Sequence, residues 1–174
     1  MPQVRRHAGG ATRPFLALLA AGLAAVALPA CDPPPNTLEG SLTEVIDLNF
    51  TDVEVSITDA QIIVGWWKPH NEGRDIVFKL VANKLPAEVV PGEVIDLSPR
   101  EDGTARASCT RSVAGDPIRT YANIKSGTLR LNAIPKLDLN VGGEMRVTFD
   151  EGGDAGKGRT AFGHFNVLQV KPGS

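Results

Sequence analysis

Hydrophobic residues recur at every second position over much of this 174-residue chain. Val53, Val55 and Ile57, for example, are separated by single polar residues. Five runs follow this pattern: residues 52–57, 76–81, 118–124, 128–132 and 144–149. Successive side chains of a strand point to opposite faces, whereas one face of a helix recurs about every 3.6 residues. The chain from Ser41 onward is therefore predicted to form strands that each turn one face toward a core.

Turn-forming residues interrupt these runs at short intervals. Glycine and proline stand between the runs in segments 69–73, 91–92, 115–117 and 142–143. Short strands separated in this way are typical of antiparallel sandwiches and barrels. We expect a single all-β domain, an antiparallel β-sandwich or open barrel of about ten short strands. A helix is conceivable only over residues 83–89, where Pro86 disfavours it.

Two hairpins are expected within this domain. Residues 60–67 should pair with residues 74–82 across a loop that contains His70. Residues 143–149 should pair with residues 160–170 across a glycine-rich loop. The second hairpin would tie the C-terminal part of the chain into the sheet.

The first 31 residues have the layout of a secretory signal. Three arginines precede an uncharged run of roughly 14 residues, and small residues follow that run. The segment closes with Leu28-Pro29-Ala30-Cys31. It resembles the type II signal peptide of bacterial lipoproteins, whose lipobox ends in the cysteine that becomes lipidated. The apolar run is shorter than the about 20 residues that a membrane-spanning helix needs.

The resemblance implies that residues 1–30 are removed and that Cys31 becomes an N-terminus bearing diacylglycerol and an acyl chain. The protein would then be anchored in the membrane of a bacterial cell envelope, on the extracytoplasmic side. Pro29 departs from the usual lipobox pattern. An ordinary secreted protein, cleaved after Ala30, is the alternative.

The segment between the lipid and the domain is rich in proline. Residues 31–40 are predicted to form a tether that holds the domain, residues 41–174, about 25 Å from the bilayer. Prolines 33, 34 and 35 favour an extended conformation of this tether.

The charge of the mature chain argues against a nucleic-acid partner. Residues 1–30 contain three of the 18 basic residues and none of the 20 acidic ones, so the remaining chain has a net charge of −5. Its charges of both signs are interspersed, with no basic stripe that could neutralise phosphates. Once Cys31 is lipidated, Cys109 is the single thiol, expected to be a small buried residue, and no internal disulfide can form.

No motif of the mature chain predicts catalysis or a cofactor. Residues 156–160 follow no phosphate-binding loop pattern, and the acidic loop 150–154 follows no calcium-loop pattern. His70 and His164 lack metal-ligand spacing, and nothing in the sequence places His164 beside Cys109. We therefore expect a protein that is not an enzyme and that uses no metal or cofactor.

Trp66 and Trp67 are the most prominent candidates for ligand binding. Because adjacent strand residues point to opposite faces, one indole could enter the core while the other is exposed. An exposed indole near His70 would offer a stacking surface for a sugar ring or a peptide. The alternative is that both indoles are covered, one by the core and one by a loop or a second sheet.

Together these features favour a lipid-anchored, non-enzymatic structural or interaction module, with an envelope protein or a glycan as its partner. The first alternative is a solute- or glycan-binding module that uses an exposed tryptophan. The second is a hydrolase of the cell wall or of polysaccharide. Such an enzyme would need His70 or His164 beside a nucleophile or a carboxylate pair in a cleft.

Overall fold

The structure is a computed structural model that describes residues 34–116, 121–154 and 158–173. The chain divides at Cys31, and all described residues belong to the unit that begins at Asp32. The predicted signal segment, the predicted lipidation residue Cys31 and residues 156–157 of the rejected phosphate loop lie outside the described residues.

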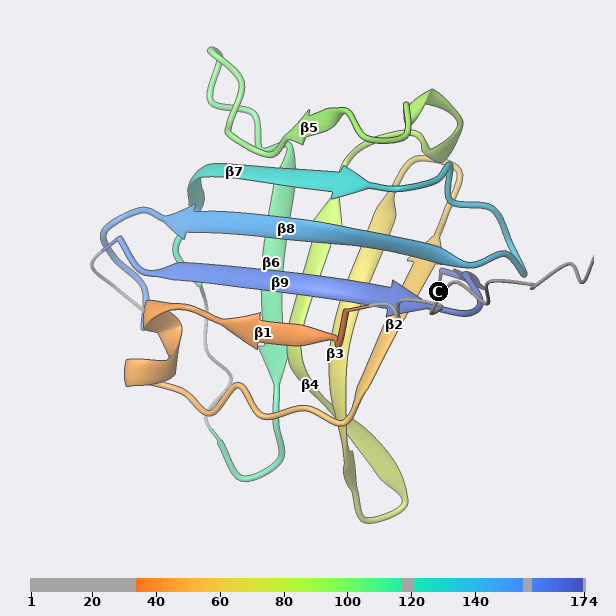
Figure 1. Ribbon diagram of the computed structural model, residues 1–174. Helices are drawn as coiled ribbons and strands as arrows, with labels where there is room; N and C mark the ends of the chain where they lie inside the picture. The colour runs from red at the N-terminus through yellow and green to blue at the C-terminus, as the bar shows by residue number, and fades with distance from the viewer. Residues whose placement is uncertain (1–33, 117–120, 155–157, 174) are drawn as a thin grey trace, which may run out of the picture. The chain divides into compact units, whose positions relative to one another are not determined.

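Ten strands in the described residues form two five-stranded sheets (Figure 1). Sheet A contains, in spatial order, β1 (Thr37–Glu39), β9 (Thr160–Val167), β8 (Val141–Phe149), β7 (Ile124–Leu131) and β5 (Val94–Asp96). Sheet B contains, in spatial order, β10 (Lys171–Pro172), β2 (Asp52–Ile57), β3 (Ile62–His70), β4 (Gly73–Ala82) and β6 (Ala107–Ser112). The described residues also form two short 3₁₀ turns, η1 (Ser41–Glu44) and η2 (Pro86–Glu88).

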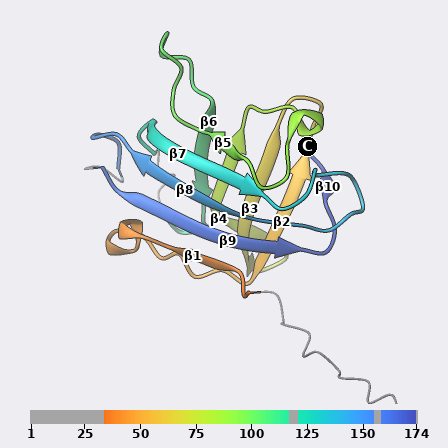
Figure 2. The same cartoon turned by 45° about the horizontal axis from the view of Figure 1, so that its top comes forward.

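The two sheets pack against each other as a β-sandwich, and their strands cross at a steep angle (Figure 1, Figure 2). All paired strands are antiparallel except β10 and β2, which are parallel. The predicted all-β sandwich is confirmed, and the sheets do not close into a barrel.

Aromatic rings connect the two sheets through the core. Trp66 of β3 contacts Phe78 of β4 edge-on, with ring centroids 5.9 Å apart, and Phe165 of β9 at 6.0 Å. Phe78 in turn contacts Tyr121, which stacks on Phe149 of β8 at 5.2 Å. Edge-to-face and offset-stacked pairs of this kind add stability beyond the burial of their area. The centre of the core therefore combines rings from both sheets with that of Tyr121, which precedes β7.

Both predicted hairpins are confirmed, β3 with β4 and β8 with β9, but the first contains a bulge. Trp66 pairs with Phe78 and Trp67 pairs with Ile76, so Val77 is an extra residue on β4. An extra residue reverses the facing of the side chains beyond it. Ile76, which the alternation places on the face of Phe78, instead lies half-buried beside Trp67, while Val77 is fully buried.

Part of the predicted tether is a strand. Thr37 to Glu39, inside the segment 31–40, form β1 and pair with β9, and Leu38 is buried. The attachment extends back to Asn36, whose Oδ1 accepts the backbone N–H of Asn166 at 2.6 Å. A run of three residues is too short to show a period of two, and β1 forms because the edge of β9 offers unpaired backbone groups.

The strand predicted over residues 118–124 is not found in the part that the structure describes. Residues 117–120 lie outside the described residues, residues 121–123 are irregular, and β7 begins only at Ile124. Tyr121, which the alternation assigned to an outward face, is buried against Phe149. Stacking in the core thus overrides the local pattern at this position.

The last predicted strand, residues 160–170, is divided between the sheets. β9 ends at Val167, and the chain crosses to sheet B, where β10 pairs with β2. At the crossing, buried Val170 forms a parallel bridge with Leu137 of the β7–β8 loop. Its N–H donates to the carbonyl of Leu139, 2.9 Å away, and its carbonyl accepts from the N–H of Asp138 at 3.0 Å. These bonds join the β7–β8 loop to the β9–β10 connection.

Candidate functional site

Trp66 is buried in the core, and a ligand cannot reach it. Its exposed fraction is 0%, and its Nε1 donates a hydrogen bond to the carbonyl of Thr37, 3.2 Å away. The ring fits because Gly163 of β9 has no side chain: a Cβ there would lie 2.5 Å from the indole Cζ2. The structure therefore removes Trp66 from the candidate ligand-binding residues.

Trp67 lies half-buried on the outer face of sheet B, covered by the side chain of Arg74. The guanidinium carbon of Arg74 is 4.6 Å from the centre of the indole, a cation–π contact. On its other side the indole lies against Gly65, where a Cβ would come within 2.6 Å of Nε1. The structure therefore favours the alternative in which both indoles are covered: the core covers Trp66, and Arg74 covers Trp67.

A carboxylate holds Arg74 in this position. Glu54 of β2 accepts hydrogen bonds from Arg74 Nη1 at 2.5 Å and Nη2 at 3.2 Å, and it also pairs with Lys171 of β10. The hydrogen bond from Arg74 is the main reason that the pKa of Glu54 is lowered. The Glu54 pair thus links β2, β4 and β10 on the outer face, and it keeps the guanidinium over the indole.

His70 is exposed at the end of β3 and contacts polar neighbours. Its Nε2 lies 2.9 Å from Asn71 Nδ2, and its Nδ1 lies 3.9 Å from the carboxylate of Asp75. Asp75 is itself buried and accepts the backbone N–H of Ala114 at 3.0 Å. His70 thus lies at the β3 end of the β3–β4 hairpin, near Asp75 of β4, which bonds the loop that follows β6.

Cys109 and His164 lie on different sheets. Cys109 is on β6 and packs against the core, and burial raises the pKa of its thiol, which disfavours the reactive thiolate. His164 is on the outer row of β9 and donates from Nδ1 to the carbonyl of Pro35, 3.2 Å away. The structure does not bring this thiol and this imidazole together as a nucleophile and its base.

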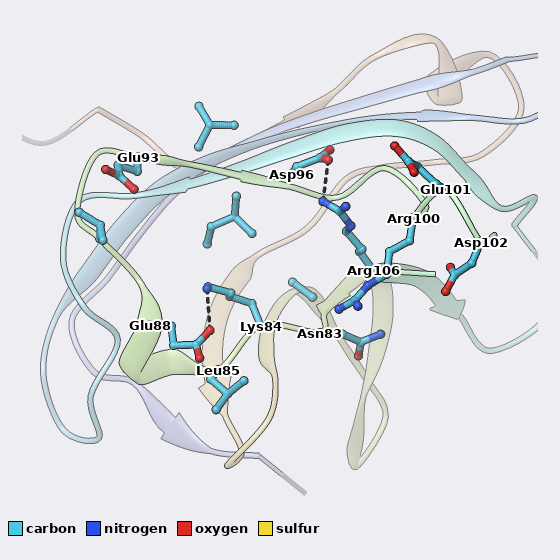
Figure 3. A pocket seen from close by; sticks show the side chains of 14 residues that line it. Asn83, Lys84, Leu85, Glu88, Glu93, Asp96, Arg100, Glu101, Asp102 and Arg106 are labelled. Atoms are coloured by element: carbon cyan, nitrogen blue, oxygen red, sulfur yellow. Dashed lines mark hydrogen bonds and ion pairs between the residues drawn. The ribbon is translucent and has the colours of Figure 1, made fainter. Parts of the chain in front are cut away.

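A hollow of about 840 Å³ lies between the β4–β5 and β5–β6 connections (Figure 3). Three exposed apolar residues contribute to its wall, Leu85, Val90 and Val94. The wall also carries three basic and five acidic residues: Lys84, Arg100, Arg106, Glu88, Glu93, Asp96, Glu101 and Asp102. Two ion pairs, Lys84–Glu88 and Arg106–Asp96, each at 2.8 Å, are visible in Figure 3.

Neighbouring residues in the sequence lower the pKa of two aspartates in the wall of this hollow. The pKa of Asp96 is lowered chiefly by a hydrogen bond from Ser98, and that of Asp102 chiefly by the backbone N–H of Thr104. Both are turns in which an aspartate caps its own backbone two residues on. The hollow thus combines exposed apolar side chains with eight charged ones, four of which are joined in ion pairs.

A second hollow, of about 300 Å³, lies where the chain enters sheet A. Pro34 forms part of its wall, together with Asn132, Gly142 and Asn166. A Cβ at Gly142 would come 2.9 Å from Asn132 Nδ2, so this glycine leaves the hollow open. The same wall includes a row of paired residues that crosses three strands: Arg130, Glu144 and His164.

The sequence patterns did not single out these hollows. Segments 82–96 and 100–106 carry no motif, and only their folding places them around one space. Arg111 was also missed: it is 4% exposed and donates to the carbonyls of Asp47 and Val77 and to the carboxylate of Asp116. The alternation of β6 places Arg111 on the inward face and so could have predicted its burial. An arginine at an inward position, however, departs from the expected apolar pattern.

Comparison with known proteins adds no relative: no family model, no curated protein and no solved structure matches this chain.

Two further kinds of feature are absent from the described residues. None of the helical segments among them is long and apolar enough to cross a membrane. Their histidine, cysteine and acidic side chains form no group of three that could hold a metal ion.

Proposed function

We propose that the protein is a lipid-anchored, non-enzymatic interaction module of the bacterial cell envelope. The observation that carries this proposal is how close to Cys31 in the sequence the chain is already bonded to sheet A. Pro35 already accepts a hydrogen bond from His164, and β1 starts at Thr37. A domain fastened to its sheet so close to the lipidation residue is suited to presenting a surface at a membrane.

The segment between Cys31 and the first described residue, Pro34, is much shorter than the whole predicted tether. Three peptide units separate Cys31 from Pro34, and consecutive Cα atoms lie about 3.8 Å apart, so the two Cα atoms are at most about 11 Å apart. The whole predicted tether would have reached about 25 Å. A lipid on Cys31 would therefore hold sheet A close to the headgroups of the bilayer.

The hollow of Figure 3 is the surface that we assign to a protein partner. Leu85, Val90 and Val94 are each about half exposed there, at 48%, 51% and 51%. Exposed apolar side chains that gather around one hollow and are rimmed by charges mark interaction sites more often than isolated ones do. Burial of these three residues would supply the apolar centre of an interface, and the surrounding ion pairs would form its polar rim.

One observation weighs against each of the two alternatives. Cys109 is half-buried against the core, desolvation raises the pKa of its thiol, and His164 lies on the other sheet. The tryptophan-based glycan alternative would require Arg74 to leave the indole of Trp67, and Glu54 holds that guanidinium in place. Unlike the glycan alternative, the interaction module needs no rearrangement at Trp67.

Metabolic labelling with a clickable fatty acid tests the anchor. The wild-type protein should incorporate the label, Cys31→Ala should lose it, and Cys109→Ala should keep it. The Cys109 variant is the matched control because it removes the other cysteine of the chain. An unlabelled wild-type protein would contradict the proposal and leave a freely secreted domain.

A further inference from the structure

Three strongly exposed leucines lie on two adjoining loops. Leu168 is 88% exposed, Leu139 is 52% exposed and Leu137 is 50% exposed. We call residues 136–139 and 168–170 the leucine tip. Scattered exposed leucines are ordinary, but a group of three on joined loops calls for a physical explanation.

The leucine tip is well fastened, so its leucines are held outward. Besides the bridge between Leu137 and Val170, the side chain of Gln169 donates to Asp138 Oδ1 at 2.6 Å. Asp138 has a φ of 63°, a left-handed conformation that aspartate tolerates better than most residues. The side chain of Val170 thus packs into the core and is fully buried, while the leucines of the two loops remain on the surface.

The leucine tip lies at the end of sheet A where the chain arrives from Cys31. The N–H of Asn166 bonds Asn36 Oδ1, and Leu168 and Pro34 each lie two residues beyond that bond. Because β1 and β9 are antiparallel, both steps lead in the same direction. Figure 1 shows the β7–β8 loop, the β9–β10 connection and the start of β1 at the same end of the sheet.

We propose that the leucine tip inserts into the interfacial layer of the membrane that carries the lipid of Cys31. This inference rests on the proposed anchoring. The occupant of the exposed leucines is then a bilayer, because at most about 11 Å of chain separates Cys31 from Pro34. Apolar side chains of membrane-surface segments bury about 5–10 Å deep at the boundary of headgroups and acyl chains.

The charge of the tip is compatible with this partner. Lys136 is exposed beside Leu137, where it can reach an anionic headgroup. The acidic residue of the tip, Asp138, is engaged by Gln169 within the tip. The lipid and the leucines would provide two points of attachment, and two points fix the orientation of the domain on the membrane, whereas a lipid alone leaves it free to rotate.

The experiment uses the mature lipidated protein in vesicles of phosphatidylcholine and phosphatidylglycerol. In a Cys109→Ala background, Leu168→Cys is labelled with a polarity-sensitive fluorophore. Val45→Cys is the matched control, since Val45 is also exposed, at 37%. Val45 follows η1, which bonds the start of β9 through Ser41 and Thr160, so it lies about 25 Å from Leu168 along that strand.

The label at position 168 should shift its emission to the blue and be quenched by spin-labelled lipid, and the label at position 45 should do neither. A protein that floats with the vesicles while the label at 168 stays unquenched would overturn the tip contact and leave the anchoring intact. Equal quenching at both positions would also overturn it, because the domain would then lie flat. A protein that does not float overturns the anchoring and the tip contact together.

Discussion

Two neighbouring indoles have different surroundings because successive side chains of a strand point to opposite faces. Trp66 enters the core, and Trp67 lies outside under Arg74. Each rests against a glycine, Gly163 in the first case and Gly65 in the second. At the residue scale the two glycines are as necessary as the tryptophans for this arrangement, because a side chain at either glycine would overlap the neighbouring indole.

Substitution Gly163→Ala should lower the thermal stability. Its Cβ would lie 2.5 Å from Trp66 Cζ2, and overpacking of a filled core costs about 1–3 kcal/mol. Thermal unfolding followed by tryptophan fluorescence measures the loss. Gly73→Ala is the matched control, because the nearest atom to its Cβ is the carbonyl oxygen of His70 at 3.7 Å. Equal unfolding temperatures of the two variants would show that the core yields at Trp66.

Glu54 should make the stability depend on pH. Folding lowers its pKa from the ordinary value of 4.5, chiefly through the hydrogen bond from Arg74. A carboxyl with a lowered pKa stabilises the fold above its unfolded pKa, and this contribution is lost as the pH falls through the folded value. At pH 7, Glu54→Gln should therefore be less stable than the wild type by about 1 kcal/mol, and the difference should shrink below pH 4.5.

Urea unfolding at several pH values measures this difference. Glu144→Gln is the control, because its pair with Arg130 is exposed on both sides and contributes little. A Glu54 variant whose deficit is the same at every pH would show that the loss comes from packing and not from charge.

At the element scale, the shortest strands have the largest consequences. β1 has three residues, yet its pairing with β9 places part of the predicted tether in sheet A. β10 has two residues, yet its pairing with β2 carries the chain end into the other sheet. Neither strand would be stable alone, and each exists because a longer strand offers it an edge.

Substitution Leu38→Asp should detach β1. Leu38 is 9% exposed, and a carboxylate there would be buried without a partner, at a cost of about 1–3 kcal/mol. Hydrogen–deuterium exchange should then rise over residues 36–39 and along the partner strand β9, whose edge is uncovered. Glu39→Ala, an exposed position of the same strand, should leave the exchange unchanged. Unaltered exchange in the Leu38 variant would show that β1 is held by its backbone bonds alone.

At the scale of the whole molecule, the stability has to come from packing. The sequence contains two cysteines, and the proposed lipidation of Cys31 would leave Cys109 without a partner in the same chain. The described unit instead relies on two sheets whose inner faces share one aromatic core. Reduction therefore has no crosslink to remove within a single chain.

The unfolding temperature of the mature protein should be the same with and without dithiothreitol. Ellman's reagent should react slowly with the folded protein, because burial raises the pKa of the Cys109 thiol. After unfolding in guanidinium it should titrate one thiol per chain. Rapid reaction in the folded state would show that the edge strand β6 opens readily.

The sequence by itself determined the all-β class, the two hairpins and the position of most turns. Alternation and turn chemistry act between residues that are close in the chain, so they can be read without a structure. The lipidation of Cys31 is also predicted from adjacent residues, and it stays a prediction.

Only the tertiary structure decided which strands share a sheet and what surrounds each candidate residue. The burial of Trp66 depends on Gly163, and the cover of Trp67 depends on Arg74 held by Glu54. The hollow of Figure 3 and the leucine tip likewise combine segments that carry no motif of their own. These features arise from contacts between residues far apart in the chain, and no local pattern encodes such contacts.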